Sequence, residues 1–168
     1  MARPVIVCYD GSSAATEALR YVISVLSSAP LVVLTVWREL TEEMISSGAA
    51  PPAGDPAAIN EHARQAAHEA AHTGAELARK AGLRAEPLAV KTTGPIWRAI
   101  EAVAQERDAL MLVCGTARSG LKTVMPGDTA VALVQHASRP TLVVPTSKSA
   151  HERRRHAERD LRAHETAV

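Results

Sequence analysis

The residues best suited to bind a phosphate group lie in the segment 115–123, which reads Gly-Thr-Ala-Arg-Ser-Gly-Leu-Lys-Thr. This segment differs by one inserted leucine from the phosphate-binding loop of nucleoside triphosphatases. In that loop the lysine directly follows the last glycine, so that its amino group reaches the terminal phosphates while backbone amides surround the others. Here Leu121 separates Gly120 from Lys122, and the segment follows the fourth predicted strand instead of the first. We therefore reject a true loop of this class.

A second pattern, His-Glu-Ala-Ala-His at residues 68–72, matches the zinc-protease motif letter for letter. Two histidines four residues apart share one face of a helix and can bind a metal ion, with Glu69 as general base. A third ligand is needed, but no suitably spaced glutamate or histidine stands out downstream in residues 91–96, and Ala75 stands where the longer motif has glycine. The surrounding segment is rich in Ala, Glu, Arg and His. We interpret the motif as a chance arrangement on a solvent-exposed face, and expect neither a metal ion nor a catalytic residue.

Composition limits the classes of function that the chain can serve. Its 168 residues are enough for one domain with a full hydrophobic core. Two Trp, two Tyr and no Phe are too few aromatic residues for the stacking platforms that bind nucleic acid, and a net charge of +1 gives no field that would recruit DNA or an anionic membrane. No apolar run approaches the roughly 20 residues that span a bilayer, and the N-terminus does not read as a signal sequence. We expect a cytoplasmic protein that binds neither nucleic acid nor membrane.

Short apolar segments alternate with segments of helical periodicity. The predicted strands are residues 5–9, 31–37, 83–90, 109–114 and 141–144. The predicted helices are residues 14–27, 57–81 and 128–137, together with one that opens at Gly94-Pro95. Ser12 or Ser13 is predicted to cap the first helix, and Gly82 to end the second. Nearly all-apolar strands that alternate with helices predict an α/β fold, in which helices cover both faces of a parallel sheet and ligands bind beyond the carboxyl ends of the strands.

The end of the chain differs in composition from the rest. After Pro145 the residues are mainly Ser, Arg, His and Glu, and the segment from Lys148 onward has six basic and four acidic residues, a net charge of +2. The preceding body then has 13 basic and 14 acidic residues, or −1. We predict one domain over residues 1–146 and a charged tail over residues 147–168, either flexible or a short helix.

Several segments resemble the universal stress protein family, in the order that the family has them. Residues 5–12, Val-Ile-Val-Cys-Tyr-Asp-Gly-Ser, are similar to its first strand and Asp-Gly-Ser turn, and residues 94–100 are similar to the entry of its third helix. The strongest similarity lies in residues 127–144, where a Leu, a His-Ala pair, a Pro and Leu-Val-Val follow the family's order without a gap. The resemblance covers residues 3–146.

The resemblance implies a Rossmann-like fold of the adenine nucleotide alpha hydrolase-like type. It implies a five-stranded parallel sheet in the order 3-2-1-4-5, helices on both faces, and a homodimer formed through the fifth strand. Many members bind ATP, and an Asp after the first strand and a Val late in the second contact the nucleoside. By position these residues are Asp10 and Val36. A carboxylate can accept hydrogen bonds from both ribose hydroxyls or from the adenine amine, and amides at a helix N-terminus hold phosphates.

The family's phosphate-binding pattern, Gly-x2-Gly-x9-Gly-(Ser/Thr), is altered in this chain. Gly115 and Gly127 match its first and third glycines, but Arg118 stands at the second glycine, Asp128 at the Ser/Thr position, and the loop is one residue shorter. The side chain of Arg118 disfavours a backbone φ above zero, and the carboxylate of Asp128 would cap the following helix and repel a triphosphate. The cations of Arg118 and Lys122 compensate in part, and Gly120 adds flexibility. The predicted cofactor is ATP, with Mg²⁺ when it is bound. The predicted cofactor-binding residues are Asp10, Val36, Gly115, Thr116, Arg118, Gly120, Lys122, Gly127, Asp128 and Thr129.

Two functions remain open. The first is a cytoplasmic stress-response protein that binds an adenine nucleotide but does not hydrolyse it rapidly, since no residue is an obvious water-activating base beside a metal ligand. The alternative is a dimeric interaction or regulatory module of the same fold that has lost nucleotide binding. For Asp10 the competing interpretation is a residue that only holds a turn. Cys8 and Cys114 lie on strands that the implied order makes neighbours, and we interpret them as buried inert thiols, with a redox pair as the alternative.

Overall fold

Five parallel strands form a sheet in the order β3-β2-β1-β4-β5, as predicted. The computed structural model describes residues 2–26, 28–39, 54–116 and 129–146. The strands are β1 Val5–Cys8, β2 Leu31–Trp37, β3 Ala85–Lys91, β4 Met111–Thr116 and β5 Thr141–Pro145. The helices in the described residues are α1 Ser13–Val25, α3 Pro56–Lys80, α4 Ile96–Glu106 and α5 Thr129–His136.

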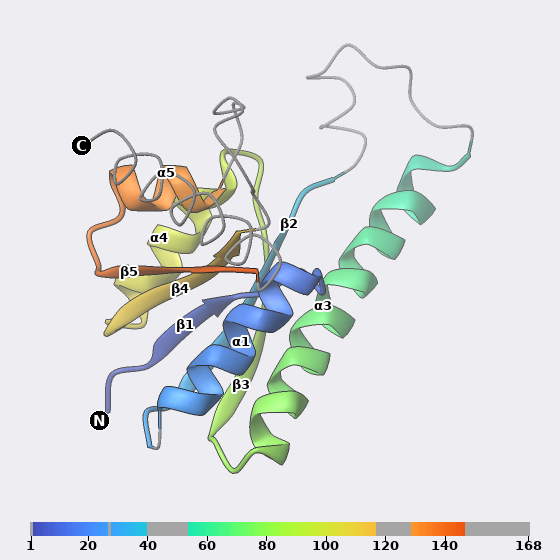
Figure 1. Cartoon of the computed structure of the whole chain (residues 1–168). Helices are drawn as coiled ribbons and strands as arrows, with labels where there is room; N and C mark the ends of the chain where they lie inside the picture. Colours follow the sequence, from blue (N-terminus) through green and yellow to red (C-terminus); the bar gives the residue numbers. More distant parts are fainter. Residues whose placement is uncertain (1, 27, 40–53, 117–128, 147–168) are drawn as a thin grey trace, which may run out of the picture.

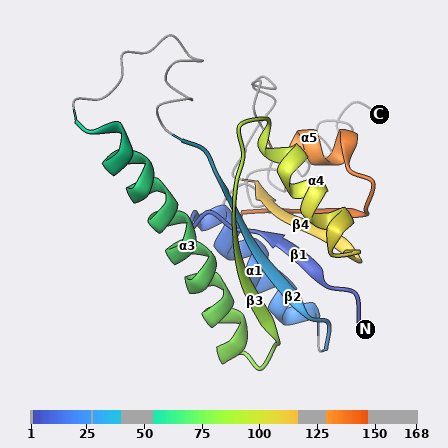
Figure 2. The ribbon, with the colours of Figure 1, turned by 180° about the vertical axis from the view of Figure 1, so that it is seen from behind.

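Helices cover both faces of the sheet, α1 and α3 on one side and α4 and α5 on the other (Figures 1 and 2). The middle strand β1 contributes to both cores: Val5 and Val7 pack on the α1/α3 side, and Ile6 packs on the α4/α5 side. None of the three has any exposed surface. A strand buried on both faces has no polar side, which explains its continuous apolar sequence. In the part of the chain that the structure describes, no helix is long and apolar enough to cross a membrane.

Local sequence signals set the ends of the helices. The Ser12 side chain caps α1 by accepting a hydrogen bond from a backbone N–H three residues on, at 3.2 Å. After α3 the chain turns through Gly82, whose φ of +87° favours glycine, and the Leu83 N–H donates back to the Ala78 carbonyl at 3.1 Å. Leu83 therefore belongs to the turn that ends α3, and β3 begins at Ala85 instead of residue 83 as predicted.

The fourth strand extends further than its sequence predicts. β4 continues through Gly115 and Thr116, which pair with Val144 and Pro145 of β5, so these two residues are not the start of a loop. A hydrogen bond from the Thr146 N–H to the Thr116 carbonyl, at 3.0 Å, continues the pairing. Pairing with a neighbouring strand thus decides the end of β4, and this partner is distant in sequence.

Glu101 of α4 ties this helix to the turn between α5 and β5. One carboxylate oxygen accepts hydrogen bonds from the Ser138 backbone N–H at 3.2 Å, from the Ser138 hydroxyl, and from the Gln105 side-chain amide at 3.0 Å. The residue is only 9% exposed. Burial alone would raise the pKa of Glu101, but these hydrogen bonds and the nearby charge of Arg139 outweigh it and hold the pKa below its ordinary value. The ionised form of Glu101 therefore stabilises the fold.

We expect Glu101→Gln to lower the free energy of unfolding by about 2 kcal/mol at neutral pH, because a neutral amide accepts weaker hydrogen bonds than a carboxylate. Since the folded pKa is depressed, the stabilisation is present above the pKa of the unfolded chain and is lost as the pH falls through the folded pKa. Urea unfolding should show a difference from wild type that shrinks at acid pH. Glu106→Gln, at an exposed position of the same helix, is the control. A difference that does not change with pH would contradict this role.

Candidate functional site

β1 ends before both of its neighbours at the point where the strand order reverses, and we call this position at the carboxyl end of β1 the notch. β1 ends at Cys8, whereas its two neighbours β2 and β4 run on to Trp37 and Thr116. Ligands of parallel α/β sheets bind at such a position, because the loops that leave the two central strands turn apart. Asp10 lies two residues after the end of β1, and α5 begins at the same edge of the sheet (Figure 1).

The structure brings half of the predicted cofactor-binding residues to this edge. They are Asp10, Val36, Gly115, Thr116 and Thr129, which lie at the ends of β1, β2 and β4 and at the start of α5. The other predicted residues lie outside the described residues and stay predictions; they are Arg118, Gly120, Lys122, Gly127 and Asp128.

Asp10 holds the turn between β1 and α1. Its Oδ1 atom accepts a hydrogen bond from the Ser12 N–H at 2.9 Å, and Gly11 has a φ of +79°. This is an Asx turn, which agrees with the interpretation of Asp10 as a turn residue. The residue is exposed, and its second oxygen, Oδ2, takes no part in that bond. The same carboxylate can therefore hold the turn and offer an acceptor to a ligand.

The peptide groups of β2 point alternately to its two neighbours. The Leu34 carbonyl accepts a hydrogen bond from the Tyr9 N–H at 2.8 Å, on the β1 side, and the Trp37 carbonyl accepts one from the Thr92 N–H at 2.9 Å, on the β3 side. Residues two apart in a strand direct their N–H and C=O groups the same way. The N–H and C=O of Val36 therefore point to the β1 side, beyond the end of β1 and into the notch.

Gly115 is required by packing. A Cβ atom at this position would lie 2.1 Å from the Ala14 carbonyl oxygen and 2.9 Å from the Ala15 nitrogen. The atoms in the way belong to the backbone of α1, so no side-chain movement can relieve the overlap. The first glycine of the phosphate-binding pattern thus has a structural reason to be glycine, whether or not a nucleotide binds.

We expect Gly115→Ala to lower the free energy of unfolding by about 3 kcal/mol, because β4 and α1 must separate to admit the methyl group. Gly94→Ala is the matched control, since its Cβ atom would have the Thr92 hydroxyl oxygen as its nearest neighbour, at 4.0 Å. Urea or thermal unfolding measures both variants. Equal stability of the two would contradict the close approach of β4 to α1.

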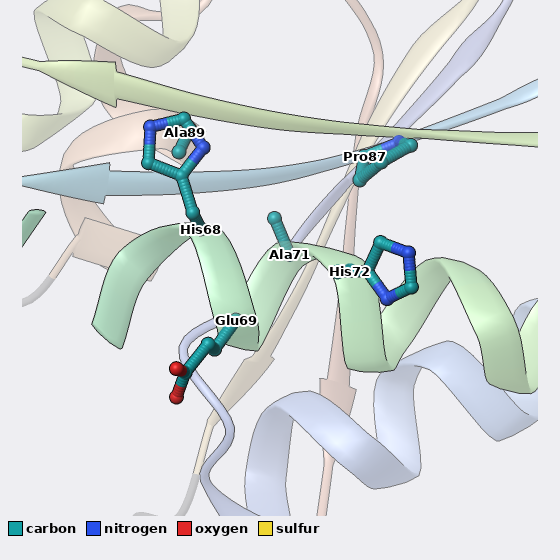
Figure 3. Close-up of a pocket in the computed structure, with 6 residues that line it drawn as sticks. All are labelled: His68, Glu69, Ala71, His72, Pro87 and Ala89. Atoms are coloured by element: carbon teal, nitrogen blue, oxygen red, sulfur yellow. The ribbon is translucent and has the colours of Figure 1, made fainter. Parts of the chain in front are cut away.

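The zinc-protease pattern lies elsewhere, on the exposed side of α3. His68, Glu69 and His72 border an open pocket of about 300 Å³, and Pro87 and Ala89 line it from β3 (Figure 3). The two imidazoles lie toward the pocket, whereas the Glu69 carboxylate points away from them (Figure 3). Within the described ranges, no three His, Cys, Asp or Glu side chains are grouped so that they could hold a metal ion. Glu69 is thus not placed to act as general base for a metal ion bound by the two histidines.

The two cysteines are thiols on neighbouring strands. Val7 of β1 pairs with Val113 of β4, which places Cys8 beside Cys114. Burial raises the pKa of the Cys8 thiol, and the neighbouring Cys114 and Asp10 raise it further. A raised pKa keeps the Cys8 thiol protonated and weakly nucleophilic, which favours inert thiols over a redox pair; Cys114 is buried and Cys8 half-buried.

Two further contacts escape prediction from sequence. The ring of His136, at the end of α5, stacks on Trp97 of α4 with 4.8 Å between ring centres and 28° between ring planes. The Thr35 hydroxyl donates a hydrogen bond to the Tyr9 carbonyl at 2.6 Å. The signal that could have identified Thr35 is its position as the one hydroxyl residue in the otherwise apolar strand β2.

The sequence profile of the universal stress protein family matches residues 1–145. No curated protein sequence matches the chain significantly.

Solved structures show the same fold. A protein from the universal stress protein family of Burkholderia pseudomallei is 22% identical, with a TM-score of 0.63, and the match covers 84% of this chain and 95% of that one. An Arabidopsis thaliana universal stress protein family protein with AMP bound is 16% identical, with a TM-score of 0.59 and coverage of 86% and 92%. The universal stress protein from Archaeoglobus fulgidus in complex with dAMP is 18% identical, with a TM-score of 0.53 and coverage of 84% and 97%.

Proposed function

Because the chain belongs to the universal stress protein family, we propose that it binds an adenine nucleotide in the notch at the carboxyl end of β1. Structures of the same fold include universal stress proteins in complex with AMP, dAMP and cAMP. At 16–20% identity these neighbours support the fold, so the proposal depends on what the notch of this chain offers.

The observation that carries the proposal is the meeting of the Asp10 carboxylate and the Val36 peptide at one notch. A carboxylate accepts hydrogen bonds from the two hydroxyls of a ribose. A backbone N–H and C=O pair can donate to N1 of adenine and accept from its N6 amine. The two groups together match the ribose and base of an adenosine.

The phosphates would lie toward the end of β4 and the start of α5. Gly115 and Thr116 end β4, and Thr129 begins α5, whose N-terminal amides favour anions. Threonine hydroxyl and phosphate oxygens are ligands that suit Mg²⁺. The ion would offset the charge of the phosphates when ATP binds. We propose binding without fast hydrolysis, since the described residues of the notch present no water-activating base beside a metal ligand.

We expect wild type to bind labelled ATP with Mg²⁺ in equilibrium dialysis, and Asp10→Asn to weaken binding about tenfold, because the amide lacks the charge of the carboxylate. Asparagine keeps an oxygen that accepts from the Ser12 N–H, so the turn survives and circular dichroism should match wild type.

In a Trp97→Phe background, Trp37 is the remaining tryptophan, and its fluorescence should report the binding of nucleotide in the notch.

Absence of binding by wild type at millimolar ATP would overturn the proposal. It would favour the second candidate, an interaction module without nucleotide, which the altered glycine pattern favours. If Asp128→Ser then gained ATP binding, repulsion between the Asp128 carboxylate and the phosphates would be the reason why wild type does not bind ATP.

We propose in addition a homodimer formed through β5. This strand is an edge of the sheet, and Thr141, Leu142 and Val143 are only half-buried. Val134 of the adjacent helix α5 is 63% exposed. An apolar edge strand presents N–H and C=O groups that pairing with a second copy would satisfy. We also propose a role in the stress response on the basis of the family resemblance, and a cytoplasmic location as expected from the sequence.

The register of β5 offers a clean test of this dimer. The Pro140 carbonyl and the Thr146 N–H form hydrogen bonds with β4. The even-numbered residues of β5 therefore direct their backbone N–H and C=O groups to β4, whereas Val143 directs its own to the free edge of the sheet. We expect Val143→Pro to remove an edge donor without breaking the β4 pairing, and to convert a dimer into a folded monomer. Sedimentation equilibrium measures the mass. Val144→Pro, which removes a donor to β4, should instead destabilise the fold. A monomeric wild type at micromolar concentration would contradict the dimer.

A further inference from the structure

We propose that Thr35 is a positioning residue of the notch. Its hydroxyl donates a hydrogen bond to the Tyr9 carbonyl, to which the Val36 N–H would otherwise donate. The N–H and C=O of Val36 then stay available to bind a ligand. This inference rests on the proposed nucleotide site. It concerns how the fold prepares that site and which base the site prefers.

The backbone hydrogen bonding between β1 and β2 changes at Tyr9, just after the end of β1. The Val5 N–H donates to the Pro30 carbonyl at 2.9 Å, and the Tyr9 N–H donates to the Leu34 carbonyl at 2.8 Å. In a regular parallel ladder the next hydrogen bond would run from the Val36 N–H to the Tyr9 carbonyl. Among the described residues this bond is not formed, and Thr35 Oγ1 donates to the same carbonyl at 2.6 Å.

The side of the sheet explains why a side chain replaces a backbone donor. Thr35 lies on the same face of β2 as Val33, which packs on the α1/α3 side. The chain leaves β1 toward α1 on this side, where the Tyr9 carbonyl accepts the hydrogen bond from the Thr35 hydroxyl. Two contacts hold Tyr9 in place. Its ring packs closely on Gly74, where an added Cβ atom would lie 3.0 Å from the ring. Its hydroxyl lies 3.3 Å from the Thr16 hydroxyl, within hydrogen-bond distance.

The hydrogen bond between Thr35 and Tyr9 is shielded from solvent. Thr35 is 6% exposed and Tyr9 5%. A buried hydroxyl or carbonyl without a partner is costly, and water cannot easily replace either group here. We therefore expect the bond to persist with the notch empty or filled, so that the Val36 N–H is not drawn back into the ladder.

A single peptide with a free donor and acceptor distinguishes purine bases. Adenine presents an acceptor at N1 and a donor at N6, which complement the N–H and C=O of Val36. Guanine in the same pose presents a donor at N1 and an acceptor at O6, so that donor meets donor and acceptor meets acceptor. By fixing the Val36 peptide, Thr35 should favour adenine over guanine nucleotides.

Hydrogen exchange measured by NMR tests the strand end without any ligand. In the wild-type protein we expect the Val36 amide to exchange at least about tenfold faster than the Leu34 amide, which lies within the ladder. In Thr35→Val, which keeps the shape and removes the hydroxyl, the Val36 N–H should close onto the Tyr9 carbonyl and exchange more slowly. Thr35→Ser keeps the hydroxyl and should behave as wild type. A Val36 amide as protected as Leu34 in wild type would overturn the proposal.

Equilibrium dialysis with ATP and GTP then tests the consequence for binding. Thr35→Val should bind ATP about tenfold more weakly than wild type and lose preference for ATP over GTP, whereas Thr35→Ser should retain both. ATP binding by Thr35→Val as tight as that of wild type would overturn the positioning role. If wild type binds neither nucleotide, the proposed function fails, and the exchange of the Val36 amide in the three proteins still decides whether Thr35 controls the strand end.

Discussion

Burial of β1 on both faces is the constraint on which the rest of the structure depends. Val5, Ile6 and Val7 have no exposed surface and face the two cores in turn. A strand in this position needs parallel neighbours along both edges, and the connections between parallel strands must pass over the faces as helices. β2 lies on one side of β1 and β4 on the other, and both extend beyond its last residue. The notch therefore lies at the carboxyl end of β1. The location of the candidate site thus follows from how the middle strand is buried.

Two polar side chains beside this notch, those of Asp10 and Thr35, have structural partners, which hold the strand end and the turn in place without a ligand. The Asp10 carboxylate holds the Ser12 N–H, and the Thr35 hydroxyl holds the Tyr9 carbonyl. These bonds use side chains where the regular ladder has stopped, and they fix the turn into α1. A preformed site of this kind loses less conformational entropy on binding than one that must be ordered by its ligand. The contacts that stabilise the fold therefore also position the groups that face the notch.

Sequence patterns predict the parts of this fold that local physics decides. Continuous apolar runs identified the strands, and Ser12 and Gly82 marked helix ends, because a capping hydroxyl and a left-handed turn are properties of a few adjacent residues. The extension of β4 through Thr116 and the hydrogen bonds of Glu101 depend on partners distant in sequence, and no local pattern reveals them. The same holds for Thr35, whose partner precedes it by a whole helix and turn.

The first glycine of the nucleotide pattern shows why a motif must be separated into its structural and its ligand-binding parts. Gly115 is needed because the backbone of α1 occupies the space of a side chain, so its presence is expected in a nucleotide-binding protein and in an interaction module alike. Arg118 and Asp128 change the part of the pattern that would face phosphates, but a nucleotide also gains affinity from its base and ribose. In the proposed site those contacts depend on Asp10 and on the Val36 peptide, whose positions follow from the turn after β1 and from the pairing of β2. The proposed nucleotide binding therefore depends first on the groups at the end of β1, and the altered loop sequence bears on the contribution of the phosphates.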